Sequence, residues 1–180
     1  MTCLDQRQVR AAGAIAGGSL AWYALKTRAR HEKVVARALA SKGVEHFLPL
    51  QRVRRRWSDR FQLIEVPLFS TYLFVRLHPE QRLQALAVRG AVCLLGSGGT
   101  PTPVPDGEIE AVRRLMASGL ALDVHTRLRP GQRVRIRSGP LRGIEGTLLR
   151  RRGRTQLVVA VDLIGQGAAL TIDGLDVEAA

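Results

Sequence analysis

The chain has 180 residues, enough for one ordinary domain or two small ones, and 46% of them are hydrophobic. That share supports packed cores and argues against a disordered protein. The formal net charge of +13 indicates a polyanionic partner such as nucleic acid, although a generally arginine-rich composition would give the same excess.

Two cysteines, Cys3 and Cys93, are too few for a disulfide framework, and neither has a second cysteine or a histidine at metal-ligand spacing. Cys93 lies in an apolar run and is predicted to be a small core residue. No apolar run reaches the roughly 18 residues of a membrane span. Residues 1–20 are typical of a disordered leader and not of a signal peptide. We therefore expect a cytoplasmic protein in a reducing compartment.

The first half of the chain predicts the order strand, helix, strand, strand, helix, strand, which is typical of the split β-α-β, ferredoxin-like arrangement. A basic hairpin over Arg52–Val66 is expected between the second and third of these strands. The predicted core elements are strands at Trp22–Thr27, Val44–Leu50, Tyr72–Leu77 and Ala91–Leu95, with helices at Ala29–Lys42 and from Pro79 to Gly90.

A third helix is predicted to start at Asp106, because Ile109, Val112 and Met116 form one apolar stripe, and to end at Gly119. It would close a first domain of residues 21–118. Residues 119–128 have no clean hydrophobic period and are expected to be a linker.

The last part of the chain, residues 129–180, has the pattern of short strands separated by glycine turns. Val134 and Ile136 alternate with arginines, as in a half-buried strand, and the turn from Gly139 to Gly146 contains three glycines and a proline. Such a span predicts a small closed barrel of SH3 type. The predicted fold class is therefore α+β, a ferredoxin-like domain followed by an SH3-like β-barrel.

The turn from Gly139 to Gly146 resembles the KOW motif of bacterial transcription elongation factors and certain ribosomal proteins. With Trp22-Tyr23, Gly43 to Pro49, Pro67-Leu68-Phe69 and Tyr72 to Val75 added, residues 21–178 resemble the NusG family, which joins a ferredoxin-like NGN domain to a KOW barrel. Trp57 to Arg60 and Glu65 to Phe69 are closer to its specialised RfaH and UpxY paralogues. Here, however, Ser70-Thr71 replaces their usual Pro-Gly or Pro-Asn.

The resemblance implies a monomeric elongation or antitermination factor that works by contact, without catalysis, cofactor, metal or membrane. The first domain would bind the clamp coiled coil of the largest RNA polymerase subunit and suppress pausing or termination, on selected operons if the paralogue assignment holds. The implied polymerase-binding residues are Tyr23, Leu25, Phe69 and Tyr72. We expect Phe69 to be exposed at an interface, whereas core packing is at least as good an interpretation of Tyr23.

Two basic sets are candidate nucleic-acid contacts. Arginines around an aromatic side chain suit backbone phosphates and a stacked base; in the hairpin these are Arg54, Arg55, Arg56, Trp57 and Arg60. A solvated hairpin with Trp57 folded onto the domain is an equal alternative. By family position, the non-template DNA strand would meet the first helix and nearby loops, at Arg28 and Lys42 with help from Lys33 and Arg37.

In the KOW domain, Ile144, Leu163 and Ile164 correspond to family positions that bind a small-subunit ribosomal protein or a termination factor, and barrel core is the alternative. Two other functions remain open. A ribosome- or RNA-associated KOW protein would explain the charge but not the first domain. An enzyme would need a clustered acid–base or nucleophile set, whereas the four histidines are scattered along the chain.

Overall fold

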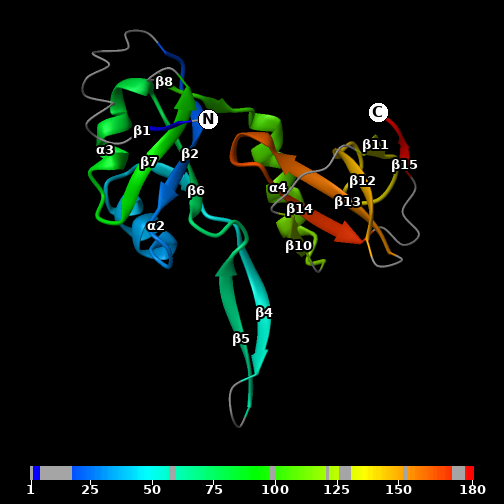
Figure 1. Ribbon diagram of the computed structural model, residues 1–180. Helices are drawn as coiled ribbons and strands as arrows, with labels where there is room; N and C mark the ends of the chain where they lie inside the picture. The colour runs from blue at the N-terminus through cyan, green and yellow to red at the C-terminus, as the bar shows by residue number, and fades with distance from the viewer. Residues whose placement is uncertain are drawn as a thin grey trace. The chain divides into compact units, whose positions relative to one another are not determined.

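The computed structural model describes residues 2–4, 18–56, 60–97, 100–120, 122–125, 131–151, 154–171 and 177–180. The chain divides into two compact units, residues 1–106 and 107–180 (Figure 1). None of the helices within the described ranges is both long and apolar enough to cross a membrane.

The first unit is built on an antiparallel sheet flanked by helices. Its elements are β1 (Thr2–Leu4), β2 (Ala21–Thr27), α2 (Glu32–Ser41), β3 (Glu45–Phe47), β6 (Tyr72–Leu77), the 3-10 turn η1 (Pro79–Gln81), α3 (Arg82–Leu86), β7 (Ala91–Ser97), β8 (Thr100–Pro101) and β9 (Pro103–Val104). The strand order is β1-β7-β2-β6-β3, with β8 beside β7 and β9 beside β2. The inner order β7-β2-β6-β3 and the alternation with helices confirm the predicted ferredoxin-like arrangement.

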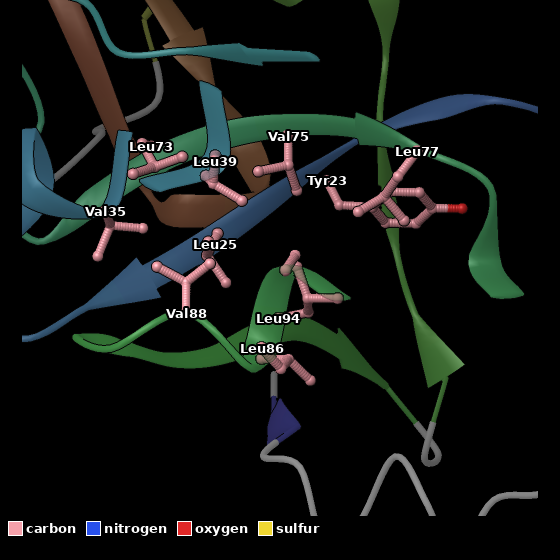
Figure 2. Close-up of a cluster of buried hydrophobic side chains, with 11 residues drawn as sticks. Tyr23, Leu25, Val35, Leu39, Leu73, Val75, Leu77, Leu86, Val88 and Leu94 are labelled. Atoms are coloured by element: carbon pink, nitrogen blue, oxygen red, sulfur yellow. The ribbon is translucent and has the colours of Figure 1, made fainter. Parts of the chain in front are cut away.

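One face of this sheet is covered by α2 and α3. Because alternate residues of a strand point to opposite faces, Tyr23 and Leu25 of β2 share a face with Leu73, Val75 and Leu77 of β6. Figure 2 shows these side chains in one cluster with Val35 and Leu39 of α2 and Leu86 of α3. Burial raises the pKa of the Tyr23 phenol above its ordinary value of 10.0. This cluster is the hydrophobic core of the first unit.

Residues Thr2–Leu4 form an edge strand, which corrects the prediction of a disordered leader for this stretch. β1 pairs antiparallel with β7, and a disulfide joins Cys3 to Cys93, whose Cα atoms lie 5.5 Å apart. Cys93 is fully buried, as predicted. The disulfide was not predicted, because the cysteines are 90 residues apart and the sequence does not reveal that β1 lies beside β7. Residues 5–17 of the expected leader lie outside the described residues.

Strands β4 (Leu50–Arg56) and β5 (Phe61–Pro67) form a separate two-stranded sheet. The register runs from Leu50 opposite Pro67 to Arg56 opposite Phe61, which confirms the predicted basic hairpin. The hairpin extends away from the main sheet of its unit (Figure 1). Its predicted turn at Ser58-Asp59 lies outside the described residues.

The second unit combines a helix with a six-stranded antiparallel sheet. Its elements are α4 (Asp106–Ala117), whose first residue ends the first unit, β10 (Leu122–His125), β11 (Gln132–Ile136), β12 (Glu145–Arg151), β13 (Arg154–Val161), the 3-10 turn η2 (Asp162–Ile164), β14 (Gln166–Thr171) and β15 (Val177–Ala179). The strand order is β10-β14-β13-β12-β11-β15. On β11, Val134 and Ile136 are buried between exposed arginines, as the period of two predicted. The two units together confirm the α+β class.

Three details of the second unit differ from the expectation. Leu122–His125 pairs with β14, so part of the expected linker is a strand that two polar residues concealed. From Gly107 onward α4 lies in the second unit, whereas the sequence placed this helix in the first domain. Its buried stripe is completed by Leu115, while Met116 is only half-buried.

Gly146 lies where two strands of the second unit approach closely. A Cβ atom at this position would lie 2.6 Å from the carbonyl oxygen of Val158 and 2.9 Å from Cδ1 of Leu157. We therefore expect Gly146→Ala to lower the free energy of unfolding of the full chain by about 1–3 kcal/mol, measured by urea denaturation. Gly107→Ala on α4 is the control: nothing lies within 4 Å of its Cβ position and alanine favours a helix, so stability should be unchanged or higher. Equal losses in both variants would contradict the packing explanation.

Candidate functional site

Three hydrogen bonds fix the loop that joins β5 to β6. The Thr27 N–H donates to the Thr71 carbonyl over 2.8 Å, and the Tyr72 N–H donates to the Phe69 carbonyl over 3.2 Å. The Thr71 N–H donates to Oε1 of Glu32 over 2.7 Å. Glu32 is buried in the first turn of α2. The loop is thus tied to both β2 and α2.

Thr71 adopts a left-handed backbone conformation, with φ of 67°. For a β-branched residue this conformation costs on the order of 1–3 kcal/mol, whereas glycine and asparagine tolerate it. The Pro-Gly or Pro-Asn of the specialised paralogues would satisfy the same backbone directly. In this chain the hydrogen bond to Glu32 offsets the strain and keeps the loop in place.

Three phenylalanines pack together beside this loop. The rings of Phe69 and Phe74 meet edge to face with centroids 6.1 Å apart, and those of Phe47 and Phe74 are stacked at 6.2 Å. Phe47 of β3 stands opposite Phe74 of β6 in the sheet register. Phe74 points to the face of the sheet opposite the helix-covered core, because it alternates with Leu73 and Val75.

The predicted polymerase-binding residues are distributed over both faces of the sheet. Tyr23 and Leu25 belong to the core beneath α2 and α3. Phe69 has no exposed surface, which corrects the expectation that it is exposed: its ring is enclosed against Phe74. Tyr72 is half-buried and shares the face of Phe74. A contact role for these four residues stays a prediction, but in this structure only Tyr72 offers a partner some accessible surface.

Phe47 was missed by the sequence analysis. It is half-buried, like Tyr72, and lies on the same face of the sheet. At the margin of this face, Arg76 of β6 forms an ion pair with Glu45 of β3 over 3.6 Å. The signal that could have revealed Phe47 is its place in an alternating strand, but its position opposite Phe74 depends on a strand pairing that the sequence does not show.

The basic residues predicted around α2 are accessible but spread out. Arg28 precedes the helix, Lys42 follows it, and both are exposed. Arg37 is exposed and Lys33 half-buried; four residues apart, they share one side of the helix. A strand of nucleic acid would have to run along the helix to meet all of them.

The hairpin divides its basic residues between two faces. Arg54 and Arg56 share a face, whereas Arg55 points to the other, and all three are exposed. The Arg54 guanidinium lies 4.1 Å from the centroid of the Phe61 ring. Arg60 is exposed directly before the return strand, and Trp57 lies outside the described residues. Phe61 was not a predicted site residue, although it is the aromatic group that an arginine covers.

In the second unit, the predicted partner-binding residues are mostly interior. Ile144 and Ile164 are buried, in keeping with the barrel-core alternative, and Leu163 is half-buried. Leu163 and Ile164 lie in the 3-10 turn η2, which follows β13. The accessible surface of Leu163 therefore depends on the 3-10 turn that follows β13.

Two side chains of α4 hold loops of this unit. Nη2 of Arg114 donates to the carbonyls of Pro140, over 3.2 Å, and Arg142, over 2.6 Å. Oε2 of Glu108 accepts a hydrogen bond from the Asp162 N–H over 3.3 Å. The pKa of Glu108 is raised, first by its burial and then by the charge of Asp162. The helix therefore anchors both the glycine turn and η2.

Arginines on β11, and Arg137 directly after it, are matched by carboxylates on neighbouring strands. Arg135 donates to Glu145 through Nε over 3.0 Å and through Nη2, and Arg133 lies 3.7 Å from the same carboxylate. Arg137 pairs with Glu178 over 3.5 Å. Among the described residues, no group of three or more His, Cys, Asp or Glu side chains is arranged to hold a metal ion.

Removing the Glu32 carboxylate should loosen the β5–β6 loop. We expect Glu32→Ala to lower the free energy of unfolding by about 2 kcal/mol, because a hydrogen bond to a charged group is lost and the Thr71 N–H is left without it. Glu32→Gln keeps an acceptor oxygen and should cost clearly less. Urea denaturation measures both values, and hydrogen exchange at Thr71 should accelerate in the alanine variant only. Identical losses would contradict the hydrogen-bond role.

The Glu145 ion pairs predict a loss of stability in acid. The hydrogen bond from Arg135, followed by that residue's charge, lowers the pKa of Glu145 below its ordinary value of 4.5. A lowered folded-state pKa means that this stabilisation is complete above the unfolded-state pKa and disappears as the pH falls through the folded-state value. The melting temperature of the wild type should therefore fall when the pH is lowered from neutral to about 3. The melting temperature of Glu145→Gln should fall less over the same range. Parallel pH profiles would show that the pair contributes nothing.

Comparisons with known proteins agree with this architecture. The family model described as "Transcription termination factor nusG" matches residues 20–113, more than half of the chain. The "Transcription termination/antitermination protein NusG" of Borreliella burgdorferi is 25% identical over 181 residues, covering 89% of this chain and 98% of the relative. A solved structure described as "Domain interaction in Thermotoga maritima NusG" shares the fold, with 23% identity, a TM-score of 0.52, and coverage of 89% of this chain and 97% of the other. The chain belongs to the NusG family of transcription termination and antitermination factors.

Proposed function

We propose that this protein binds RNA polymerase through its first unit and suppresses pausing or termination, on selected operons, as the specialised paralogues do. The observation that supports the proposal is an aromatic patch on the sheet face opposite α2 and α3. Tyr72 and Phe47 form its accessible part, and Phe74 and Phe69 support it from beneath. We call this set the aromatic patch.

The patch has the physical features of a binding hot spot. Aromatic side chains dominate binding energies where they are well packed and partly shielded from water. The Phe47–Phe74–Phe69 contacts hold the rings, and the hydrogen bonds of Thr71 fix the loop beside them. Because little would have to be ordered on binding, more of the contact energy is retained as affinity.

Suppression of pausing requires preferential binding to one polymerase state. In this proposal the first unit binds the clamp coiled coil of the largest subunit and holds more tightly to the closed clamp than to the open one. A factor with equal affinity for the open and the closed clamp would not change the equilibrium between them. Tyr23 and Leu25 then support the sheet from the core side and do not touch polymerase.

The second unit would recruit another machine to the transcript, a small-subunit ribosomal protein or a termination factor, and raise its local concentration. Leu163 is the predicted contact that retains accessible surface. The basic residues along α2, Arg28, Lys33, Arg37 and Lys42, would contact the non-template strand. An RNA- or ribosome-associated KOW protein is the alternative function, but it gives the aromatic patch no role.

Tyr72→Ala should weaken polymerase binding by about tenfold or more, as truncation of an aromatic hot spot does, and should reduce terminator readthrough to the same extent. The variant should stay folded, because Tyr72 is only half-buried. In vitro transcription with purified polymerase, scoring pausing and readthrough, measures the effect. Val34→Ala removes an apolar side chain on α2 that is 49% exposed and should behave like wild type.

The same preparation distinguishes the alternative function. If the wild-type chain leaves pausing unchanged and co-purifies with ribosomes instead of polymerase, the proposed function is wrong and the RNA- or ribosome-associated function replaces it.

A further inference from the structure

One face of the β4–β5 hairpin combines arginines with exposed apolar side chains. The strand register places Arg52 opposite Glu65, Arg54 opposite Leu63, and Arg56 opposite Phe61. Residues opposite each other in an antiparallel pair, and every second residue along a strand, point to the same side. These six residues therefore line one face, which we call the arginine–aromatic face.

The apolar side chains of this face are open to water. Phe61 is 57% exposed and Leu63 is 62% exposed, on a hairpin that projects from the main sheet of the first unit (Figure 1). The central carbon of the Arg54 guanidinium lies over the Phe61 ring, 4.1 Å from the ring centroid. Such a contact orders both side chains before any ligand arrives, so less ordering remains to oppose binding.

The charge of the face selects a polyanion. It carries three arginines against one carboxylate, and Glu65 is already 3.5 Å from Arg52. Arg54 and Arg56 face no carboxylate in the strand register, since their cross-strand neighbours are Leu63 and Phe61. Successive arginines on the face advance about 6.6 Å along β4, a repeat that an extended sugar–phosphate backbone can follow.

The apolar groups select unpaired bases. In a duplex, bases are stacked on one another and present only their edges, whereas in a single strand their flat faces are free to stack on an aromatic ring. A ring flanked by arginines on a ribbon provides a stacking surface and phosphate contacts together.

We propose that the arginine–aromatic face is a binding site for single-stranded nucleic acid. A base stacks on Phe61, a neighbouring base contacts Leu63, and Arg52, Arg54 and Arg56 contact phosphates. Arg55 points away and takes no specific part. The site does not depend on the aromatic patch or on polymerase, so it stands or falls separately from the proposed function.

The experiment measures binding of the full chain to a fluorescently labelled oligothymidine, and to a duplex of equal length, by fluorescence anisotropy. Wild type should prefer the single strand. Phe61→Ala should weaken single-strand binding roughly 5- to 150-fold, the range for loss of one stacked base, and Phe61→Trp should restore it. Because Phe61 is largely exposed, neither variant should disturb the fold, and circular dichroism verifies this.

A matched pair separates the specific face from general charge. Arg54→Ala and Arg55→Ala remove one positive charge each from adjacent positions of β4, but only the first removes the cation over Phe61. We expect Arg54→Ala to weaken binding several-fold more than Arg55→Ala, with a shallower dependence on salt. Equal effects of the pair, unchanged affinity in Phe61→Ala, or a preference for duplex would each overturn the proposal.

Discussion

The alternation of side chains along β2 and β6 determines what the first unit can present to a partner. Adjacent residues such as Leu73 and Phe74 are both fully buried, yet they face opposite sides of the sheet. The first lies in the aliphatic core beneath the helices and the second in the phenylalanine group. A shift of β6 by one residue against β2 would exchange the two sets, and neither the core nor the patch would survive it.

This constraint explains why the loop before β6 is held so firmly. Tyr72 begins the strand, so the conformation of Thr71 directly before it sets the register at which β6 enters the sheet. Thr27 of β2 and Glu32 of α2 both bind Thr71, which joins three elements at this point. A left-handed residue of unfavourable type persists there because its surroundings fix it.

The sequence predicted those features that depend on neighbouring residues. The strand Tyr72–Leu77 was predicted to the residue, because its apolar run is bounded by clear breaks. The hairpin and the alternation of Val134 and Ile136 were likewise visible locally.

Features that depend on contacts between distant residues were missed. Phe69 was expected at the surface because it lies just outside a strand, but its ring is buried and packs edge to face against Phe74 of β6. The Cys3–Cys93 disulfide required knowing which strand forms the sheet edge. Phe61 was not predicted because its partner Arg54 lies on the other strand of the hairpin. In the sequence, Trp57 is the aromatic residue that stands among the arginines.

The arginines of β11 and those of the β4–β5 hairpin have very different partners. On β11, arginines alternate just as they do on β4, but Glu145 of β12 pairs with Arg133 and Arg135, and Glu178 of β15 pairs with Arg137 directly after β11. On β4 the single cross-strand carboxylate is Glu65, at one end of the face. A generally arginine-rich composition would produce both strands equally and would not place an exposed aromatic ring beneath a guanidinium. The difference between the strands therefore argues that the hairpin, and not the β11 surface, is where the excess charge serves a ligand.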